Sequence, residues 1–406
     1  MGAEKVIVLG GDGFCGWPTA LHLSEAGYDV TMVDDFSRRD IDDSTGSNSL
    51  TPIVSMVQRI AAWRQVSGGK LIDFKRINVA GNYNGLKDIL RKIKPAAVVH
   101  FAKQRAAPYS MKNADTKRYT VTNNVAASHN LLCAIVETGL TDTHIIHLGT
   151  MGVYGYGKGG ITIPEGYLHA QLIDVVTKEA VEAEIYYPPD PGSVYHMTKV
   201  MDTMMFYFYN KNDALRITDL HQGIVWGAGT DNTARHPDLI NRFDYDGDYG
   251  TVLNRFLIQG TLGHPLTVYG TGGQTRAFIH IQNMCECIQL ALESPPDKGS
   301  RVRVWNQTTE QLNLMDLARI VRDLTGAEIR LYNNPRAEAE SNTLAACMDN
   351  IHGMGLNPIH VTKGALGNMG DIVRQCAGRI KPDKIFATSM WRADRTVDRK
   401  GVVYDA

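Results

Sequence analysis

A β-branched run, a glycine-rich turn and an amphipathic stretch follow one another at the start of the chain. Residues 5–9 (KVIVL) lead into a turn that carries Gly10, Gly13 and Gly16, and the amphipathic stretch continues to Ala26. Glycines at this spacing allow a tight turn, close approach of the backbone to a pyrophosphate, and close packing of a helix on a strand. The pattern predicts a strand–turn–helix unit that binds a dinucleotide, its phosphates at the helix N-terminus. The alternative is a glycine turn without a ligand.

A second expected strand, residues 29–33, ends at Asp34, which lies 21 residues after Gly13. A carboxylate at this position accepts hydrogen bonds from the ribose of the cofactor and favours NAD over NADP. Arg38 and Arg39 follow closely, and could instead receive the 2′-phosphate of NADP. The turn supplies further predicted contacts to the cofactor, at Gly10, Asp12, Gly13, Phe14, Cys15 and Gly16.

The first half of the chain alternates strand and helix patterns. This alternation predicts an α/β fold with a doubly wound parallel sheet of the Rossmann type, covered by helices on both faces. Between the second and third strands, residues 36–70 form a long insertion, with a polar loop over 40–49 and a helix that opens at Thr51-Pro52. The expected strands are 5–9, 29–33, 71–77, 97–102, 144–149 and 215–220, and the expected helices are 14–26, 52–66, 84–93, 115–138 and 193–212.

The pattern changes after about residue 221 and predicts a smaller C-terminal α/β lobe that binds the substrate. We expect a Rossmann domain over 1–220 and a lobe over 221–406 that is interleaved with it. Ligands of open α/β sheets lie at the carboxyl ends of the strands, so the site is expected where the loops after residues 101, 149 and 220 face this lobe. Its expected strands are 265–270, 277–280 and 302–306, and its expected helices are 250–262, 281–293 and 313–325.

Charge and composition narrow the class of protein. The 406 residues carry a formal net charge of −1, so no global field attracts nucleic acid or an acidic membrane. No apolar run is long enough to span a membrane, and the first strand leaves no room for a signal peptide, which together indicate a cytoplasmic protein. Cys285 and Cys287 would point to different faces of a predicted helix, so we expect reduced thiols and no metal site.

Tyr195 and Lys199 have the spacing Y-x-x-x-K at the start of a predicted helix. Residues four apart share a helix face, so the ammonium of Lys199 can favour ionisation of the phenol and lower its pKa from about 10. Such a phenol can take a proton from a sugar hydroxyl while hydride leaves the same carbon for a nicotinamide. Thr150, at the end of a predicted strand, can bind the same substrate oxygen.

Together the glycine turn, Asn124, Thr150, Tyr195 and Lys199 resemble the extended short-chain dehydrogenase/reductase superfamily, whose members act on nucleotide sugars. More specific motifs resemble the UDP-sulfoquinovose synthase family, and this likeness covers nearly the whole chain to about residue 360. The segments that carry it are 10–17, 100–111, 148–152, 242–246, 253–256, 263–270, 272–276 and 334–336.

The resemblance implies a reaction and a set of site residues. That family converts UDP-glucose and sulfite to UDP-sulfoquinovose, a sulfolipid head-group donor, through a 4-keto sugar and a tightly held, recycled NAD. Tyr195 would then be the base, Lys199 would tune it and Thr150 would hold the 4-hydroxyl; relatives commonly form homodimers through the two helices that carry Asn124 and Tyr195. Further implied cofactor contacts are Asn78, Val79, Asn124 and Gln222, and implied substrate contacts are Gln104, Arg105, His196, His221, Gln222, Arg255, Gln274, Arg276 and Arg336, with Arg276 and Arg336 on the diphosphate.

Two departures from the family pattern affect this interpretation. Val153 stands where plant members have glutamate, and Met151 and Gly152 stand where ordinary 4,6-dehydratases have aspartate and glutamate. Elimination across C5 and C6 still needs a group that moves the C5 proton, and the remaining candidates are His196, His221 and Lys103. The second departure is Asn78, where the superfamily usually has aspartate near the adenine.

Three functions therefore compete. UDP-sulfoquinovose synthase is the first, and in it Arg105, together with His196 or His221, would guide the anionic sulfite. An NDP-sugar 4-epimerase or dehydratase of another pathway is the second, favoured by Val153, because epimerisation needs no elimination catalyst. A sensor of nucleotide sugars without catalysis is the third, and the presence of Thr150, Tyr195 and Lys199 argues against it.

Overall fold

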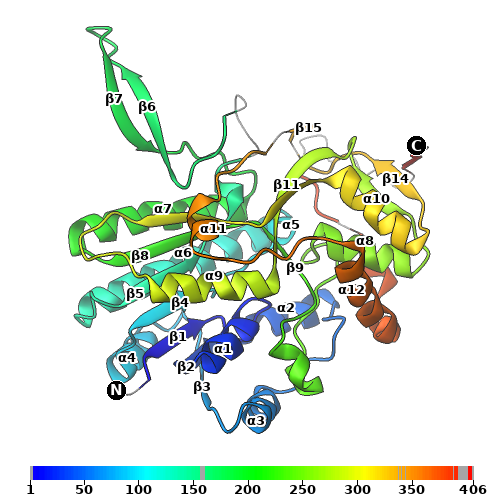
Figure 1. Cartoon of the computed structure of the whole chain (residues 1–406), viewed down its shortest axis with the longest axis horizontal. Coiled ribbons are helices and arrows are strands. Elements are labelled where there is room, and N and C mark those ends of the chain that lie inside the picture. The colour runs from blue at the N-terminus through cyan, green and yellow to red at the C-terminus, as the bar shows by residue number, and fades with distance from the viewer. Residues whose placement is uncertain are drawn as a thin grey trace.

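The computed structural model describes residues 3–155, 161–336, 338–339, 341–342, 344–386, 388–391 and 401–404. Its centre is a seven-stranded sheet in the order β12-β8-β5-β4-β1-β2-β3, with every neighbouring pair parallel (Figure 1). This confirms the predicted Rossmann-type α/β fold. The strands are β1 (Lys5–Leu9), β2 (Asp29–Asp34), β3 (Ile72–Arg76), β4 (Ala97–His100), β5 (His144–Leu148), β8 (Arg216–Gln222) and β12 (Arg303–Gln307).

Helices bury both faces of this sheet. In β1, Val6 and Val8 pack into one hydrophobic cluster, whereas Ile7 and Leu9 pack into another. A strand that is covered on both sides reads as a continuous apolar run rather than an alternating one, which explains the composition of residues 5–9. The first cluster includes α1 (Gly16–Glu25) and α9 (Ile281–Glu293), and the second includes α4 (Tyr83–Ile93), α6 (Ala114–Glu137) and α7 (Val194–Asp213).

The two parts of the chain are interleaved. The strand expected over 302–306 is β12, and it pairs with β8 in the main sheet rather than lying in the second lobe. The helix before it, α9, packs against α1. The boundary at residue 220 stays a prediction, because the chain returns to the first sheet after it.

The C-terminal lobe has its own hydrophobic core, with Phe243, Phe256, Phe278 and Leu317 buried together. No helix in the described part of the chain is long and apolar enough to cross a membrane. The remaining elements are the strands β9 (Ile224–Trp226), β10 (Leu266–Tyr269), β11 (Gly273–His280), β13 (Glu310–Asn313), β14 (Ile329–Tyr332), β15 (Ser341–Asn342) and β16 (Val402–Val403), the helices α5 (Ala107–Ser110), α8 (Val252–Thr261), α10 (Leu314–Thr325), α11 (Asp349–Gly353) and α12 (Lys363–Gln375), and 3₁₀ turns at Met151–Val153, Thr233–Arg235, Pro237–Leu239, Ala377–Arg379 and Pro382–Lys384.

The insertion between β2 and β3 differs from its prediction. Where a polar loop was expected, α2 (Ser37–Thr45) forms, held by an i,i+4 ion pair between Arg38 and Asp42 at 2.6 Å and ended by Gly46 at φ +65°. The helix expected from Pro52 is α3 (Met56–Val66), which starts later because Ser55 is its N-cap. There Ser55 and Gln58 form a capping box, a stronger start signal than the proline.

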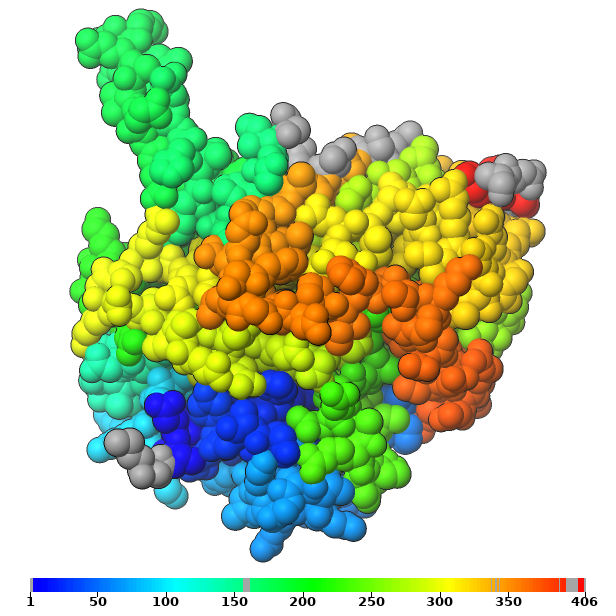
Figure 2. All heavy atoms as spheres, in the orientation of Figure 1, coloured from blue at the N-terminus to red at the C-terminus, as the bar shows by residue number. Residues whose placement is uncertain are grey.

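A β-hairpin absent from the predictions extends from the body of the protein (Figures 1 and 2). Its strands are β6 (Tyr167–Ile173) and β7 (Ala180–Tyr186), and its tip exposes Val175 and Val176. At its base, Tyr186 packs against Tyr207 of α7, with ring centroids 5.4 Å apart. The turn contains no glycine and instead places Lys178 at φ +63°, so the usual sequence signal of a hairpin is missing.

Candidate active site

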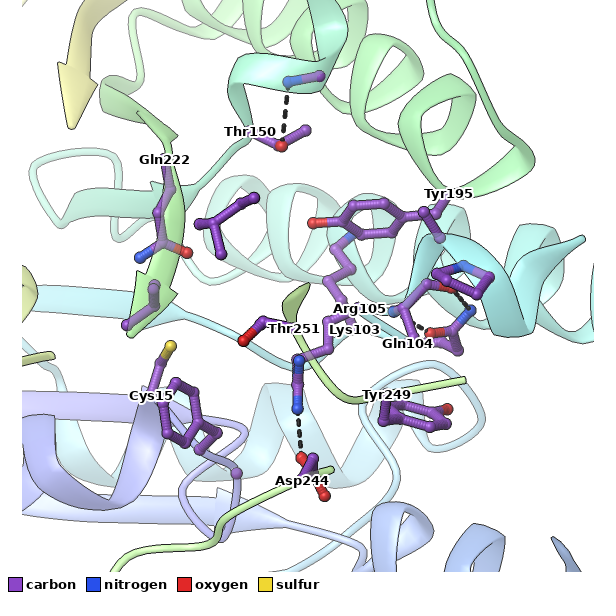
Figure 3. Close-up of a pocket in the computed structure, with 18 of the residues that line it drawn as sticks. Cys15, Lys103, Gln104, Arg105, Thr150, Tyr195, Gln222, Asp244, Tyr249 and Thr251 are labelled. Carbon is purple, nitrogen blue, oxygen red and sulfur yellow. Dashed lines mark hydrogen bonds and ion pairs between the residues drawn. The ribbon is translucent and has the colours of Figure 1, made fainter. Parts of the chain in front are cut away.

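A cavity of about 360 Å³ lies where the carboxyl ends of the main sheet face the C-terminal lobe. The loops after β4, β5 and β8 line it, through Gln104, Thr150 and Gln222, and Arg255 and Gln274 line it from the other lobe. Figure 3 shows side chains from both parts pointing into this space. The cavity continues along the glycine turn, so one connected site can hold a dinucleotide and a second ligand.

The glycine turn forms a cradle that side chains would fill. Gly10 has φ +86°, and a Cβ added to Gly16 would lie 2.0 Å from the carbonyl oxygen of Gly10. A Cβ added to Gly11 would lie 2.7 Å from Met32 on β2. Gly13 lines the cavity just before α1, so the N-terminal end of this helix, with its N–H groups and its dipole, is directed at the cavity, which suits the pyrophosphate of a dinucleotide.

Asp34 ends β2 beside this cradle. Its carboxylate accepts the backbone N–H of Asp12 at 2.9 Å and that of Phe36 at 2.7 Å, while burial and the neighbouring Asp12 raise its pKa to about 7. Arg39 lies outside the cavity lining and donates to both oxygens of Asp12 at 2.7 Å. Arg38 does line the cavity, but it is paired with Asp42 and Asp244. With both arginines paired, the site fits NAD better than NADP.

The remaining cofactor predictions fall into two groups. Asn78 and Val79 line the cavity, and Asn78 donates to Asp35 at 2.6 Å. Asn124 lies behind the wall instead: its amide accepts the N–H of Gln104 at 2.7 Å and donates to the Gln104 carbonyl at 2.8 Å and to Thr198 at 3.1 Å. Asn124 therefore holds the loop after β4 against α7. It positions this loop and does not itself line the cavity.

Thr150, Tyr195 and Gln222 converge on one space (Figure 3). The phenol of Tyr195 points toward the gap between the other two side chains, and the Thr150 hydroxyl accepts the N–H of Gly152 at 3.2 Å. Lys199 follows one turn later on α7, with its Nζ 5.9 Å from the centre of the Tyr195 ring. This arrangement can hold a sugar hydroxyl between a threonine and a tyrosine.

The expected lowering of the tyrosine pKa by Lys199 is not what the protein alone shows. Burial raises the pKa of Tyr195 above its ordinary value, and the cation that most opposes this rise is Arg105. Burial also lowers the pKa of Lys199 to about 7. In the protein without ligands, burial thus opposes the effect predicted from spacing, and Lys199 favours the ionised phenol only while its ammonium stays protonated.

His196 occupies the space that a side chain at residue 152 would need. A Cβ added to Gly152 would lie 2.4 Å from Cδ2 and from Nε2 of the imidazole. The ring lines the cavity, and its buried Nδ1 has no hydrogen-bond partner among the described residues. Burial lowers the pKa of His196 to about 3, and Arg336 and Arg276 act in the same direction, so the imidazole is neutral and can accept a proton.

The other two acid–base candidates are held by the protein. His221 does not line the cavity, and its Nε2 lies 3.1 Å from a carboxylate oxygen of Asp219. Lys103 lines the cavity, but its ammonium donates to Ser128 at 2.5 Å and to Asp202 at 2.9 Å. The substrate contact predicted for His221 stays a prediction, with its side chain outside the cavity lining, whereas His196 lines the cavity.

On the C-terminal side, several cavity-lining polar groups lack partners. Both polar atoms of the Gln274 amide and Nε of Arg255 have no hydrogen-bond partner among the described residues. Arg276 is paired with Glu338 at 2.6 Å, and the Arg336 guanidinium lies 4.8 Å from the centre of the Trp391 ring. Glu338 lines the cavity and was missed by the sequence analysis, because no spacing connects it to Arg276.

Arg105 also meets a residue that sequence reasoning did not assign. Its guanidinium pairs with Asp244, which Arg38 and Arg242 also contact, at 2.9 Å and 3.1 Å. Asp244 and the nearby Tyr249 line the cavity from the segment before α8 (Figure 3). The motif around residue 242 had marked this segment as part of the resemblance without indicating its contact with Arg105.

Most of the chain matches a known protein family. Residues 6–306 match the NAD dependent epimerase/dehydratase family. The chloroplastic UDP-sulfoquinovose synthase of Spinacia oleracea is 39% identical over 396 residues, covering 96% of this chain and 80% of that protein. The UDP-sulfoquinovose synthase of Sulfolobus acidocaldarius is 37% identical over 343 residues, covering 83% and 84%.

Solved structures show the same fold. The UDP-glucose 4-epimerase of Thermotoga maritima with UDP-glucose superposes with a TM-score of 0.67 at 19% identity, covering 92% of this chain and all of that one (100%). The UDP-glucuronic acid 4-epimerase of Bacillus cereus, in complex with UDP-glucuronic acid and NAD, has a TM-score of 0.65 at 22% identity, covering 92% and 99%. At these identities the likeness concerns the fold alone.

Proposed function

Because the chain belongs to the NAD dependent epimerase/dehydratase family, and within it to the UDP-sulfoquinovose synthases, we propose that it converts UDP-glucose and sulfite to UDP-sulfoquinovose and water. The cofactor of this family is NAD. In the overall change a C6–O bond breaks and a C–S bond forms at the same carbon. The hydride removed from C4 returns to C4, so no net oxidation occurs.

Different residues of the chain would bind the sugar, the cofactor and the diphosphate. Thr150 and Tyr195 hold the 4-hydroxyl between them, and Tyr195 takes its proton as C4 is oxidised. Residues 10–16 and Asp34 would hold NAD, which supplies the hydride acceptor. Arg255, Gln274, Arg276 and Arg336 line the same sugar end of the cavity and would bind the UDP group, because guanidinium and amide donors suit a diphosphate.

The position of His196 over Gly152 is the observation that carries this proposal. A 4-keto group makes the C5 proton acidic, and a neutral imidazole can remove it and return it to the leaving 6-hydroxyl. Burial is the main cause that lowers the pKa of His196, and Arg336 and Arg276 add to it. A bound diphosphate would neutralise the two arginines and so raise the basicity of the ring from its value in the empty site. The imidazole thus fills the place where the expected carboxylates are missing.

The test follows the C5 proton. In D₂O with UDP-glucose and no sulfite, the protein should exchange deuterium into C5, and adding sulfite should give a sulfonated sugar nucleotide by mass. We expect His196→Gln to lose the exchange while still reducing bound NAD, and Tyr195→Phe to lose both. UDP-galactose as the sole product would indicate an epimerase, unchanged UDP-glucose a sensor, and exchange retained in His196→Gln would remove the assigned role of His196.

We further propose a homodimer formed through α6 and α7, which pack side by side. Along α7 the side chains of Met197, Met201, Met204 and Phe208 are exposed and follow one helix face, whereas Phe206 is buried. A second copy would cover this face. Sedimentation should show a dimer that Met204→Glu with Phe208→Glu converts to a monomer; a monomeric native protein would contradict the proposal.

A further inference from the structure

A chain of buried polar groups lies beneath the catalytic side chains. His147 on β5 and Asp219 on β8 are register partners in the sheet, and Nδ1 of the imidazole lies 2.8 Å from the carboxylate. Both side chains are buried, at 0% and 1% exposure. The second oxygen of Asp219 contacts His221 at 3.1 Å and Thr203 at 3.3 Å. Although burial acts to raise the pKa of Asp219, the two histidines hold it well below its ordinary value.

Lys199 rests on this chain. Its Nζ donates to the carbonyl of Leu148 at 2.5 Å and lies 3.1 Å from Nε2 of His147. Nδ1 lies 2.8 Å from Asp219, whereas Nε2 lies 3.3 Å from Asp202 and 3.1 Å from the ammonium. An ammonium can only donate, so the imidazole that meets both partners carries its proton on Nδ1 and accepts at Nε2. An ammonium has three N–H groups, and the described residues accept two of them, so the third is left for the cavity beside Tyr195.

Opposing interactions place the pKa of Lys199 near neutral pH. Burial lowers its pKa to about 7, Asp202 and Asp219 act to raise it, and Lys103 acts to lower it. A second oxygen of Asp202 also lies 3.3 Å from Nε2 of His147. The titratable and charged groups among the described residues that interact with Lys199 are Cys15 at the N-cap of α1, His100 on β4, Lys103 after β4, His147 on β5, Tyr195 and Asp202 on α7, and Asp219 on β8.

We infer that His147 is a positioning residue for Lys199: anchored on Asp219 through Nδ1, it accepts a hydrogen bond from the ammonium at Nε2 and so keeps Lys199 charged and directed at the reacting hydroxyl. The inference rests on the proposed function, in which the Lys199 ammonium would favour ionisation of the Tyr195 phenol, and it concerns a residue outside the cavity lining. A hydrogen bond to the charged form favours that form. Without it, Lys199 loses its proton at a lower pH.

Two variants of His147 that differ by one methylene separate the contacts. In His147→Asn the amide replaces Nδ1 at Asp219 but is too short to reach Lys199. In His147→Gln the amide oxygen and nitrogen are spaced like the two ring nitrogens and can meet both partners. His144→Asn is the matched control, because His144 lies on the same strand, is 2% exposed, and bonds Thr218 of β8 at 2.9 Å without contacting Lys199.

The readout is the pH profile of turnover, measured with NAD content, the KM for UDP-glucose and the melting temperature. For His147→Asn we expect the alkaline limb to move down by about one pH unit, which corresponds to about a tenfold loss of turnover on that side. KM and NAD content should stay unchanged, and His147→Gln should restore the profile. A profile of His147→Asn that superimposes on the wild type, or a shift shared by His144→Asn, would overturn the inference.

Failure of the inference and failure of the proposed function are distinguishable. If Lys199→Ala abolishes turnover but His147→Asn leaves the profile in place, the function stands and the positioning role falls. If the wild type forms no sulfonated product, the proposed function falls, and the profile can still be measured as reduction of bound NAD by the sugar. If His147→Asn does not fold, a wild-type profile in Asp219→Asn, which weakens the anchor of the same imidazole, would overturn the inference.

Discussion

The two ends of the cavity differ in how their polar groups are satisfied. At the cofactor end, Asp12 is contacted by Arg39 and Arg59, and Asp244 by three arginines. At the sugar end, the Gln274 amide, Nε of Arg255 and Nδ1 of His196 have no hydrogen-bond partner among the described residues. At the first end the carboxylates are paired within the protein, although Nε of Arg38 and of Arg59 lacks a partner among the described residues. At the second end, an amide and one imidazole nitrogen are left for a ligand.

This difference fits the proposed cycle. A cofactor that is regenerated in each turnover need not leave, so its end of the cavity can be closed by permanent ion pairs. A nucleotide sugar must enter and its product must leave, so the other end exposes groups that only the ligand satisfies. Each buried polar atom without a partner lowers the stability by about 1–3 kcal/mol. Such a loss of stability in favour of function is common at binding sites.

The largest effect is expected where the two ends meet, at Tyr195. Tyr195→Phe removes only the oxygen that transfers the proton, so turnover should fall by about 10²–10⁴-fold. UDP-glucose affinity, NAD content and melting temperature should remain close to those of the wild type. The checks are product formation by mass and isothermal titration; near-normal turnover would show that Tyr195 is not the base.

The next largest effect concerns a paired group at the cofactor end. Asp12→Ala leaves Arg59, which is 1% exposed, as a buried charge without its carboxylate, and should lower the free energy of unfolding by about 3–5 kcal/mol. Urea unfolding measures the change. Asp73→Ala is the control, because Asp73 pairs with Lys75 at 2.7 Å on an exposed strand, where such pairs contribute about 0–1 kcal/mol. Equal losses of unfolding free energy in the two variants would show that the ion pairs of the cofactor end stabilise the protein no more than surface pairs do.

Replacing an unpaired group at the sugar end should weaken ligand binding without lowering the stability. Gln274→Met replaces a buried amide that lacks partners, so stability should hold or rise by about 1 kcal/mol while UDP-glucose binds about tenfold more weakly. The control is Gln259→Met in the same lobe, since the amide of Gln259 exchanges hydrogen bonds of 2.8 Å and 3.0 Å with Thr267. Gln259→Met should lose stability without losing affinity. A destabilised Gln274→Met would mean that its amide is satisfied in solution.

Local signals made the cofactor end predictable from sequence. The strand at 5–9, the glycine turn and Asp34 lie within one strand–helix–strand unit, and their spacing determines their geometry. α2 was missed because its local signal is a single i,i+4 pair, Arg38 with Asp42, whereas Asp42 is also held by Arg242, 200 residues away. No local pattern contains such a contact, and a polar segment without one reads as a loop.

At the sugar end, residue type alone could not separate His196 from His221. Both histidines stood near predicted catalytic positions, but only the fold shows that one faces the cavity and that the other bonds Asp219 behind it. The same holds for His147, which meets Asp219 because β5 and β8 are neighbours and meets Lys199 because α7 packs over β5. Spacing predicts residues on one element, and packing decides what meets across elements.

The smallest expected effect tests a residue that belongs to both ends. Arg105 lines the cavity and pairs with Asp244, yet its side chain is 32% exposed and Asp244 keeps Arg38 and Arg242 as partners. Removing Arg105 should therefore change stability little. As a positive charge near Tyr195 it would attract sulfite past the diphosphate, an attraction weakened by exposure and by its partner.

Arg105→Ala should raise the sulfite requirement by about tenfold at low salt, equivalent to about 1.4 kcal/mol, and leave the UDP-glucose requirement unchanged. The difference should shrink as salt screens the charge. Lys112→Ala is the control, because Lys112 has the same 32% exposure and pairs with Asp248 of the same segment at 2.6 Å. If the sulfite dependence is unchanged, or if only NAD retention falls, Arg105 does not guide sulfite and belongs with the paired groups of the cofactor end. A residue that only closes the cofactor end has no effect on a nucleophile that attacks C6.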